Sequence, residues 1–150
     1  MKVIQDVDIF SANQDIIALM ANCHGRYEKG FALRVKRSYP DTYYKHYEFC
    51  ERHMLPERVL GKLYMCTCGS GHRVASLFGQ IERINIDTDI VAFRDSLTML
   101  RDNALVAEQY IAIPFHLDMS DEVWELLEPV FDEVMPEGLV TEYTKYLRSF

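Results

Sequence analysis

The chain has 150 residues, of which 49% are hydrophobic and 26% are charged, a composition that favours one globular domain over residues 1–150. Its formal net charge of -7 weighs against general nucleic-acid binding, because that mode of binding needs an extended track of Lys and Arg. No segment is long and apolar enough to cross a bilayer, and the first ten residues lack the apolar region of a signal peptide, so we expect a cytoplasmic protein with no membrane partner.

Short apolar runs alternate with longer segments of helical periodicity. The runs typical of strands are residues 15–22, 62–68, 73–79, 109–115 and 139–147. The first and fourth are almost continuously apolar, as expected of strands covered on both faces. The polar segment CGSGH between the second and third runs favours a hairpin, so part of the sheet should be antiparallel.

The segments with helical spacing are residues 29–53, 88–104 and 120–134. Pro40 should divide the first into two helices. Thr88 or Asp87 is available to cap the second, and Ser120 to cap the third, which Pro129 should kink. Strands that alternate with helices predict an α/β fold with three α/β/α layers around a mixed sheet.

Ligands bind at the carboxyl ends of strands in such sheets, which points to the loops after Asn22 and Pro114. The loop after Asn22 contains Gly25 and Gly30. Glycine allows the main chain to approach a phosphate closely, and backbone N–H groups can bind it. The alternative is an ordinary connection between a strand and a helix.

Four cysteines raise the question of a metal or a disulfide: Cys23, Cys50, Cys66 and Cys68. Even with His24 and His72 nearby, the chain lacks the paired spacing of a zinc signature. We therefore expect no metal and no cofactor, and free thiols buried in the core.

In DIFSANQDIIALMANCHGRYEKGFALRVKRSYP, a predicted strand ends in asparagine and leads through a glycine-containing loop to a Gly-x-Ala helix start. This arrangement resembles the opening of the macro domain, the ADP-ribose-binding fold. LGKLYMCTCGSGHRVASLFGQ resembles the central hairpin of that family, YIAIPF the strand before its second phosphate loop, and VWELLEPVFDEV its last helix. The resemblance spans nearly the whole chain and looks closest to the compact branch with the terminal ADP-ribose glycohydrolase and the ADP-ribose-1''-phosphate phosphatase-like proteins.

This resemblance implies an ADP-ribose-like nucleotide, or an ADP-ribosylated protein, as the partner; the oligomeric state stays open. Asp8 would bind the adenine amino group, and Asn22 the distal ribose, while Tyr27 could cover a ribose. The ligand-binding residues that it implies are Asp8, Ile9, Asn22, Gly25, Arg26, Gly30, Ala32, Phe115 and His116. The alternatives are a solvated turn residue for Asp8 and a strand-end cap for Asn22.

The second phosphate loop departs from the family pattern, because FHLDMS, residues 115–120, contains no glycine. Such a turn should not freely adopt left-handed conformations, and its side chains should fill space that the family leaves to the diphosphate. Asp118 also adds negative charge there. Binding therefore depends on whether a hollow stays open beside Phe115 and Met119.

Catalysis has less support, because the position of the glycohydrolase branch's lysine nucleophile holds Gln80 and Ile81. Asn22 and Asp118 are the candidate catalytic residues. The hypotheses are thus nucleotide binding first, hydrolysis of an ADP-ribosyl bond or of ADP-ribose-1''-phosphate second, and a ligand-free interaction or structural domain third. Tyrosines between residues 39 and 47 could serve that third role by packing in the core or against a partner.

Overall fold

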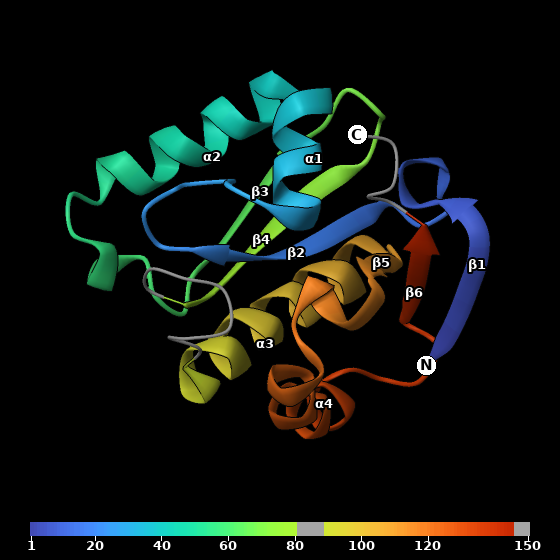
Figure 1. The fold of residues 1–150 in the computed structure, drawn as a ribbon. Helices are drawn as coiled ribbons and strands as arrows, with labels where there is room; N and C mark the ends of the chain where they lie inside the picture. Colours follow the sequence, from blue (N-terminus) through green and yellow to red (C-terminus); the bar gives the residue numbers. More distant parts are fainter. Residues whose placement is uncertain (81–88, 146–150) are drawn as a thin grey trace.

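The computed structural model describes residues 1–80 and 89–145 (Figure 1). Within these residues, one mixed sheet has the strand order β1-β6-β5-β2-β4-β3. Neighbouring strands are parallel except β3 and β4, which form an antiparallel hairpin. The strands are β1 (Lys2–Asp8), β2 (Ile16–Asn22), β3 (Leu63–Thr67), β4 (Arg73–Gln80), β5 (Ile111–Pro114) and β6 (Val140–Lys145). The helices are α1 (Gly30–Ser38), α2 (Pro40–Arg52), α3 (Ile90–Ala107) and α4 (Asp121–Val134), with short 3-10 helices η1 (Ile9–Ser11), η2 (Pro56–Arg58) and η3 (Phe115–Asp118).

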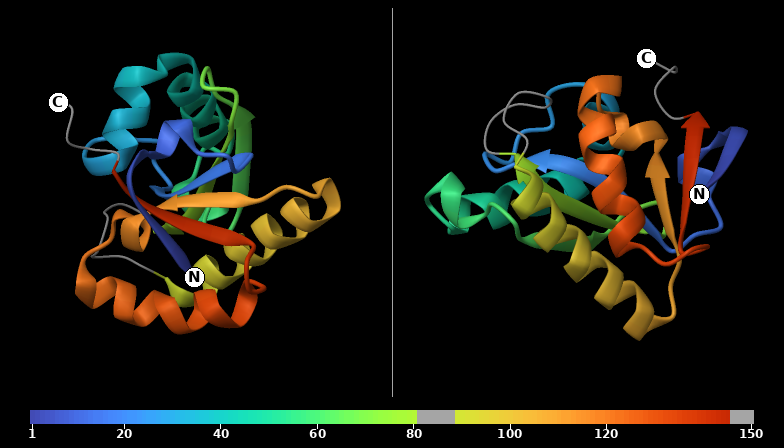
Figure 2. Two further views of the ribbon diagram at one scale, coloured as in Figure 1. Left: turned by 90° about the vertical axis from the view of Figure 1, so that its right-hand side faces the viewer. Right: turned by 90° about the horizontal axis from the view of Figure 1, so that it is seen from below.

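Helices α1 and α2 cover one face of the sheet, and α3 and α4 cover the other (Figures 1 and 2). This confirms the predicted three layers. The central strand β2 shows the physical reason, because its alternate side chains supply both cores. Ile16, Ala18 and Met20 pack on the side of α3 and α4, and Ile17, Leu19 and Ala21 pack on the side of α1 and α2.

The five predicted strands and the hairpin are confirmed, with strand ends within two residues of the prediction where they are described. Residues 146 and 147, the predicted end of the last strand, lie outside the described residues. Strand β1 was not predicted. It lies at the edge of the sheet beside β6, and most of its side chains are exposed, so no apolar pattern marks it as a strand.

The predicted division of residues 29–53 is confirmed, since α1 ends at Ser38 and α2 begins at Pro40. Proline suits the first turn of a helix because no partner for its missing N–H exists there. Helix α4 continues through Pro129 as one helix.

Two helix caps illustrate what local sequence can and cannot specify. Ser120 caps α4 as predicted, because its Oγ accepts a hydrogen bond from the Val123 N–H at 3.3 Å. The cap of α3 is Asp89, whose Oδ1 accepts from the Ala92 N–H at 3.0 Å. The predicted caps of α3, at positions 87 and 88, are therefore corrected to Asp89, and both lie outside the described residues.

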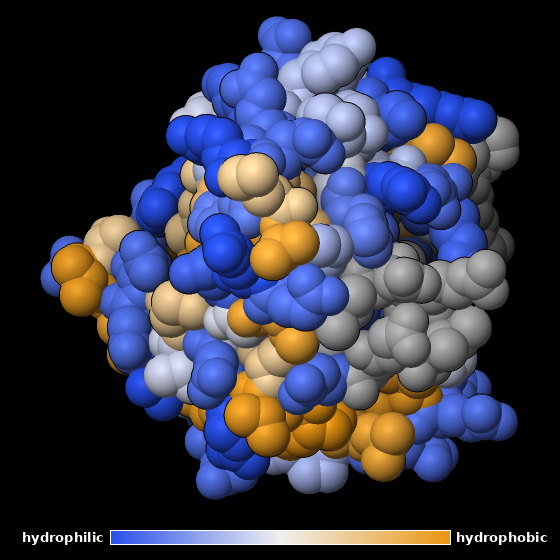
Figure 3. Space-filling view, turned by 90° about the vertical axis from the view of Figure 1, so that its left-hand side faces the viewer, coloured by the Kyte–Doolittle hydropathy of each residue, from blue (hydrophilic) through white to orange (hydrophobic). Residues whose placement is uncertain are grey.

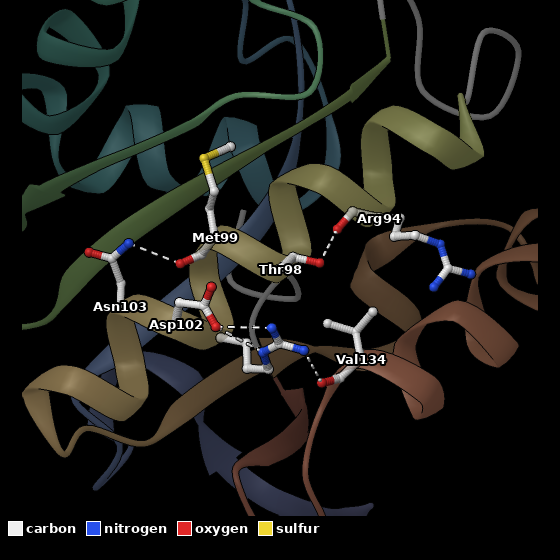
Figure 4. A network of polar contacts seen from close by, with 7 residues as sticks. Arg94, Thr98, Met99, Asp102, Asn103 and Val134 are labelled. Carbon is white, nitrogen blue, oxygen red and sulfur yellow. Dashed lines mark hydrogen bonds and ion pairs between the residues drawn. The ribbon is translucent and has the colours of Figure 1, made fainter.

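Helices α3 and α4 pack together on one side of the sheet, and a side chain of α3 binds the end of α4. Arg101 donates to the carbonyl oxygen of Val134 at 3.5 Å and pairs with Asp102 at 3.0 Å (Figure 4). The last carbonyl groups of a helix have no partner within it, so this arginine satisfies one of them. On α3 itself, Thr98 and Asn103 donate to carbonyl oxygens one turn earlier, at 2.7 and 2.9 Å.

All four cysteines are free. Cys23, Cys50 and Cys68 are buried as predicted, whereas Cys66 is partly exposed, because β3 lies at the edge of the sheet. Burial raises the pKa of both Cys23 and Cys50 to about 12. These two thiols therefore stay protonated at neutral pH and are poor nucleophiles.

The surface is mixed in character. On the face shown in Figure 3, hydrophilic side chains dominate the upper part, and apolar side chains gather toward the lower edge. The tyrosines of α2 divide between core and surface: Tyr44 and Tyr47 are exposed, whereas the Tyr43 ring packs on Tyr27 with 5.3 Å between centroids. None of the helices in the described part of the chain combines the length and the apolar character of a membrane span.

Candidate functional site

Two loops meet at the carboxyl ends of the parallel strands. Strand β2 lies between β4 and β5 in the sheet, so the loop that follows β2 and the loop that follows β5 leave the same edge. We call residues 23–29 the first loop and residues 115–120 the second loop. Helix α1 begins directly after the first loop, which places its N-terminus at this edge.

Asn22 holds the first loop in shape. Its Oδ1 accepts hydrogen bonds from the N–H groups of His24 and Arg26 at 3.0 and 3.3 Å, and its Nδ2 donates to the Arg26 carbonyl oxygen at 2.8 Å. The side chain is buried. Asn22 therefore has the strand-end capping role that was the alternative to ribose binding.

Both glycines of this region have left-handed backbones, with φ of +76° at Gly25 and +62° at Gly30. A Cβ added at Gly25 would lie 3.1 Å from the Cys50 Cβ, so this glycine lets the first loop pass close to α2. Between them, Arg26 and Glu28 are exposed and lie 3.7 Å apart. The charged side chains of the first loop thus face solvent.

The N-terminus of α1 binds a carboxylate of the second loop. The Phe31 N–H donates to Asp118 Oδ2 at 2.8 Å, and a Cβ added at Gly30 would overlap that same carboxylate. A negative charge is stabilised there because the unpaired N–H groups of a helix N-terminus carry partial positive charge. An anion of the chain itself thus occupies the place that the family resemblance gives to a phosphate.

The second loop adopts a conformation that its sequence did not predict. His116, Leu117 and Asp118 all have left-handed backbones, with φ of 52°, 54° and 61°, although the loop contains no glycine. The sequence predicts that a glycine-free turn should not freely adopt this region, yet three consecutive residues adopt it, each at a cost of roughly 1–2 kcal/mol. Tertiary contacts must offset that cost.

Those contacts come from three directions. The His116 N–H donates to Oε2 of the buried Glu142 at 2.8 Å. The His116 ring stacks on Trp124, with centroids 5.0 Å apart and planes 9° apart, and on Phe115, with centroids 3.9 Å apart. The Leu117 side chain is buried in the core. The second loop is therefore anchored at its start by β6, α4 and the core.

Side chains fill the space between the second loop and α1. Leu117 and Met119 are buried, and the cavity left there measures only about 10 Å³. Its walls are Leu19, Met20, Phe31, Ala32, Leu117, Asp118 and Met119. Phe115 is 37% exposed. In this conformation Met119 and Asp118, rather than Phe115, close the hollow, and a diphosphate requires both to move.

Asp8 lies close to α1, because it pairs with the side chain of Arg34 on that helix. Its Oδ1 accepts from the Phe10 N–H at 2.9 Å, and its Oδ2 lies 3.6 Å from the Arg34 guanidinium. The Ile9 side chain is buried, which leaves only the backbone of Ile9 for a ligand. Asp8 is therefore held near α1, the helix whose first turn carries the Phe31 N–H.

Tyr27 lies in the core and not over a ligand, which corrects the prediction that it could cover a ribose. Its hydroxyl is 3.0 Å from Ser76 Oγ, and Ser76 Oγ is 2.9 Å from His46 Nδ1. All three side chains are buried. Burial raises the pKa of Tyr27 and lowers the pKa of His46 to about 3, so the group stays uncharged.

No protein-family model matches the chain, and a search among curated proteins finds no match. Solved structures do match. A macrodomain protein from Streptomyces coelicolor has a TM-score of 0.76 at 22% identity, with 96% of this chain and 99% of that chain covered. The macrodomain of Thermus aquaticus DarG has a TM-score of 0.75 at 17% identity, with 96% and 97% covered.

The chain has the macrodomain fold. A third structure, Thermosipho africanus DarTG in complex with ADP-ribose, has a TM-score of 0.74 at 18% identity. The match covers 95% of this chain and 41% of that chain.

Within this macrodomain fold, the position expected for a nucleophile carries a structural side chain. Gln80 is fully buried, its Nε2 lies 3.8 Å from Met119 Sδ, and its carbonyl oxygen accepts from the Cys23 N–H at 3.1 Å. Ile81 lies outside the described residues.

The residues that sequence analysis missed are Glu142, Trp124 and the backbone of Phe31. Only Glu142 had a usable signal, since an acid inside an apolar strand is rarely buried without a partner.

Gly30→Ala tests the contact between α1 and the second loop. We expect the free energy of unfolding to fall by about 2–3 kcal/mol, because alanine disfavours the left-handed backbone and its methyl group displaces the Asp118 carboxylate from the Phe31 N–H. Urea denaturation measures this loss. The control is Gly138→Ala, where φ is +84° and no atom lies within 4 Å of the added Cβ, so about 1 kcal/mol should be lost. Equal losses in the two variants would argue against the overlap.

Proposed function

We propose that this protein binds ADP-ribose, or a closely related nucleotide derivative, between the first and second loops. The observation that carries this proposal is the hydrogen bond from the Phe31 N–H to the Asp118 carboxylate at 2.8 Å. It marks the N-terminus of α1 as a place that holds an anion at the carboxyl edge of the sheet. A phosphate oxygen is chemically suited to the same N–H group.

The position of Asp8 supports a nucleotide in particular. Arg34 lies three residues after Phe31, roughly 4.5 Å further along α1 at the usual helical rise, and its guanidinium lies 3.6 Å from Asp8. A carboxylate can accept a hydrogen bond from the exocyclic amine of adenine. The proposal therefore places adenine beside Asp8 and Ile9, the phosphates at Gly30, Phe31 and Ala32, and the distal ribose near the first loop.

The fold comparison supports the same class of ligand, because one of the similar structures holds ADP-ribose. The nucleotide could be free or attached to a protein, so an ADP-ribosylated protein is the macromolecular partner that we propose. We also propose a cytoplasmic location. Four free cysteines fit a reducing compartment.

Hydrolysis of an ADP-ribosyl bond, or of ADP-ribose-1''-phosphate, is the second candidate, and Asn22 and Asp118 would be its catalytic residues. Both side chains are used for structure: Asn22 holds the backbone of the first loop, and Asp118 holds α1. We therefore propose binding without turnover. Incubation with an ADP-ribosylated protein should release no ADP-ribose, and release that Asn22→Ala abolishes would favour the hydrolase instead.

Isothermal titration of the folded protein with ADP-ribose tests the proposed binding. We expect saturable binding that Asp8→Asn weakens about tenfold, because the amide loses a charged acceptor for the adenine amino group. Asp6→Asn is the matched control, since Asp6 is an exposed acid on the same strand and its loss should leave the affinity within twofold. Absence of heat at millimolar ADP-ribose would contradict the proposed function.

A further inference from the structure

We infer that Asp118 is an internal competitor for the phosphate position, so that it makes this site discriminate between ligands by their charge. The inference rests on the proposed function and assigns to one residue the selectivity of that site. The evidence for this inference is the set of contacts that the Asp118 carboxylate makes at the start of α1.

The Asp118 carboxylate and a ligand phosphate require the same donor. Asp118 Oδ2 accepts from the Phe31 N–H at 2.8 Å and lies against the Cα of Gly30, at the point where any side chain there would collide with it. A backbone N–H has one hydrogen to donate. A phosphate can therefore bind Phe31 only after the carboxylate has left it.

The construction of the second loop allows Asp118 to leave without unfolding the loop. Contacts to Glu142, to Trp124 and within the core hold His116 and Leu117, and these contacts do not involve Asp118. Displacement of the Asp118 side chain can leave them intact. Met119, which also closes the hollow, is unbranched and can adopt other rotamers.

Competition by a charged group has a consequence for selectivity. A ligand that reaches α1 with a diphosphate must displace Asp118 and also meets its negative charge. Adenosine, which carries no phosphate, can bind beside Asp8 without displacing Asp118. Asp118 should thus weaken the binding of ADP-ribose and of inorganic pyrophosphate, and leave the binding of adenosine unchanged.

Asp118→Asn tests this inference, because asparagine keeps the shape of the side chain and an oxygen that can accept from Phe31, but removes the charge. Loss of a charge at a helix N-terminus is worth about 1 kcal/mol, which corresponds to roughly five- to tenfold in affinity. We expect Asp118→Asn to bind ADP-ribose and pyrophosphate five- to tenfold more tightly than the unmodified protein, with adenosine affinity within twofold. Calorimetric titration measures all three ligands, and thermal unfolding establishes that each variant is folded.

The matched control is Glu122→Gln, which removes an exposed negative charge four residues further along the chain and should change no affinity more than twofold. Equal affinity of Asp118→Asn and the unmodified protein for ADP-ribose would overturn the inference and leave the proposed function standing. An equal gain for adenosine, or in Glu122→Gln, would also overturn it. If no form binds ADP-ribose, the proposed function fails, and the pyrophosphate titration then tests the role of Asp118 separately. Pyrophosphate binding by Asp118→Asn alone supports Asp118 as an internal competitor. Pyrophosphate binding by neither form, or equally by both, rejects it.

Discussion

Acidification from pH 7 to pH 4.5 is expected to destabilise this protein by about 2–3 kcal/mol through one buried residue, His46, since each pH unit in this window is worth about 1.4 kcal/mol. Burial lowers the pKa of His46 from 6.5 to about 3. The neutral ring is hydrogen-bonded to Ser76 and stacked on Phe78, and its Nε2 has no hydrogen-bond partner among the described residues.

The direction of this pH effect on stability depends on whether the folded or the unfolded state binds the His46 proton more readily. The unfolded chain takes up a proton at His46 as the pH falls through 6.5, whereas the folded protein resists it until about pH 3. The stabilisation by His46 is thus complete above pH 6.5 and is lost progressively between pH 6.5 and pH 3.

Urea denaturation at several pH values between 7.5 and 4.5 measures this effect in the native protein and in His46→Gln. Glutamine cannot titrate, so the difference in unfolding free energy between the two proteins should shrink by about 1.4 kcal/mol per pH unit below 6.5. His53→Gln is the control, because His53 lies just after α2 and is partly exposed. Parallel pH profiles for the native protein and His46→Gln would show that His46 is not the acid-labile group.

Trp124→Ala is expected to lower the free energy of unfolding by about 3–5 kcal/mol, the usual cost of truncating a buried aromatic residue. The Trp124 side chain is buried in α4, where it stacks on His116 and packs on Phe131 with 5.8 Å between centroids. Its loss removes one of the contacts that hold the second loop in its left-handed conformation. The effect should therefore extend to the candidate site and weaken ADP-ribose binding.

Chemical denaturation of Trp124→Ala, Trp124→Phe and Leu126→Ala separates these contributions. Phenylalanine keeps an aromatic face for His116 and should recover most of the stability. Leu126 is on the same helix but is 62% exposed, so its truncation should change stability by no more than about 0.5 kcal/mol. If Trp124→Ala lost no more than Leu126→Ala, Trp124 would not be an anchor of the second loop.

The sequence located the two loops of the candidate site, because the apolar runs before Asn22 and Pro114 are unambiguous and the carboxyl ends of parallel strands meet at one edge. It did not indicate how the second loop folds. Local preference alone disfavours left-handed His116, Leu117 and Asp118. The burial of Leu117 and the contacts of His116 with the Glu142 carboxylate and the Trp124 ring overcome that preference. Glu142 and Trp124 lie outside the second loop, so local sequence does not indicate them.

Periodicity, turn residues and the position of Pro40 were enough to derive the layered α/β architecture, the hairpin and the places where most helices begin. These features depend on neighbours within a few residues. Tertiary structure alone paired the Asp118 carboxylate with the Phe31 N–H, 87 positions apart. It also enclosed Ser76 with His46 and Tyr27, which lie 30 and 49 positions from Ser76 along the chain. The hydrogen-bond partner of a given N–H group or imidazole depends on how distant elements pack against each other. The periodicity of the sequence does not indicate that packing.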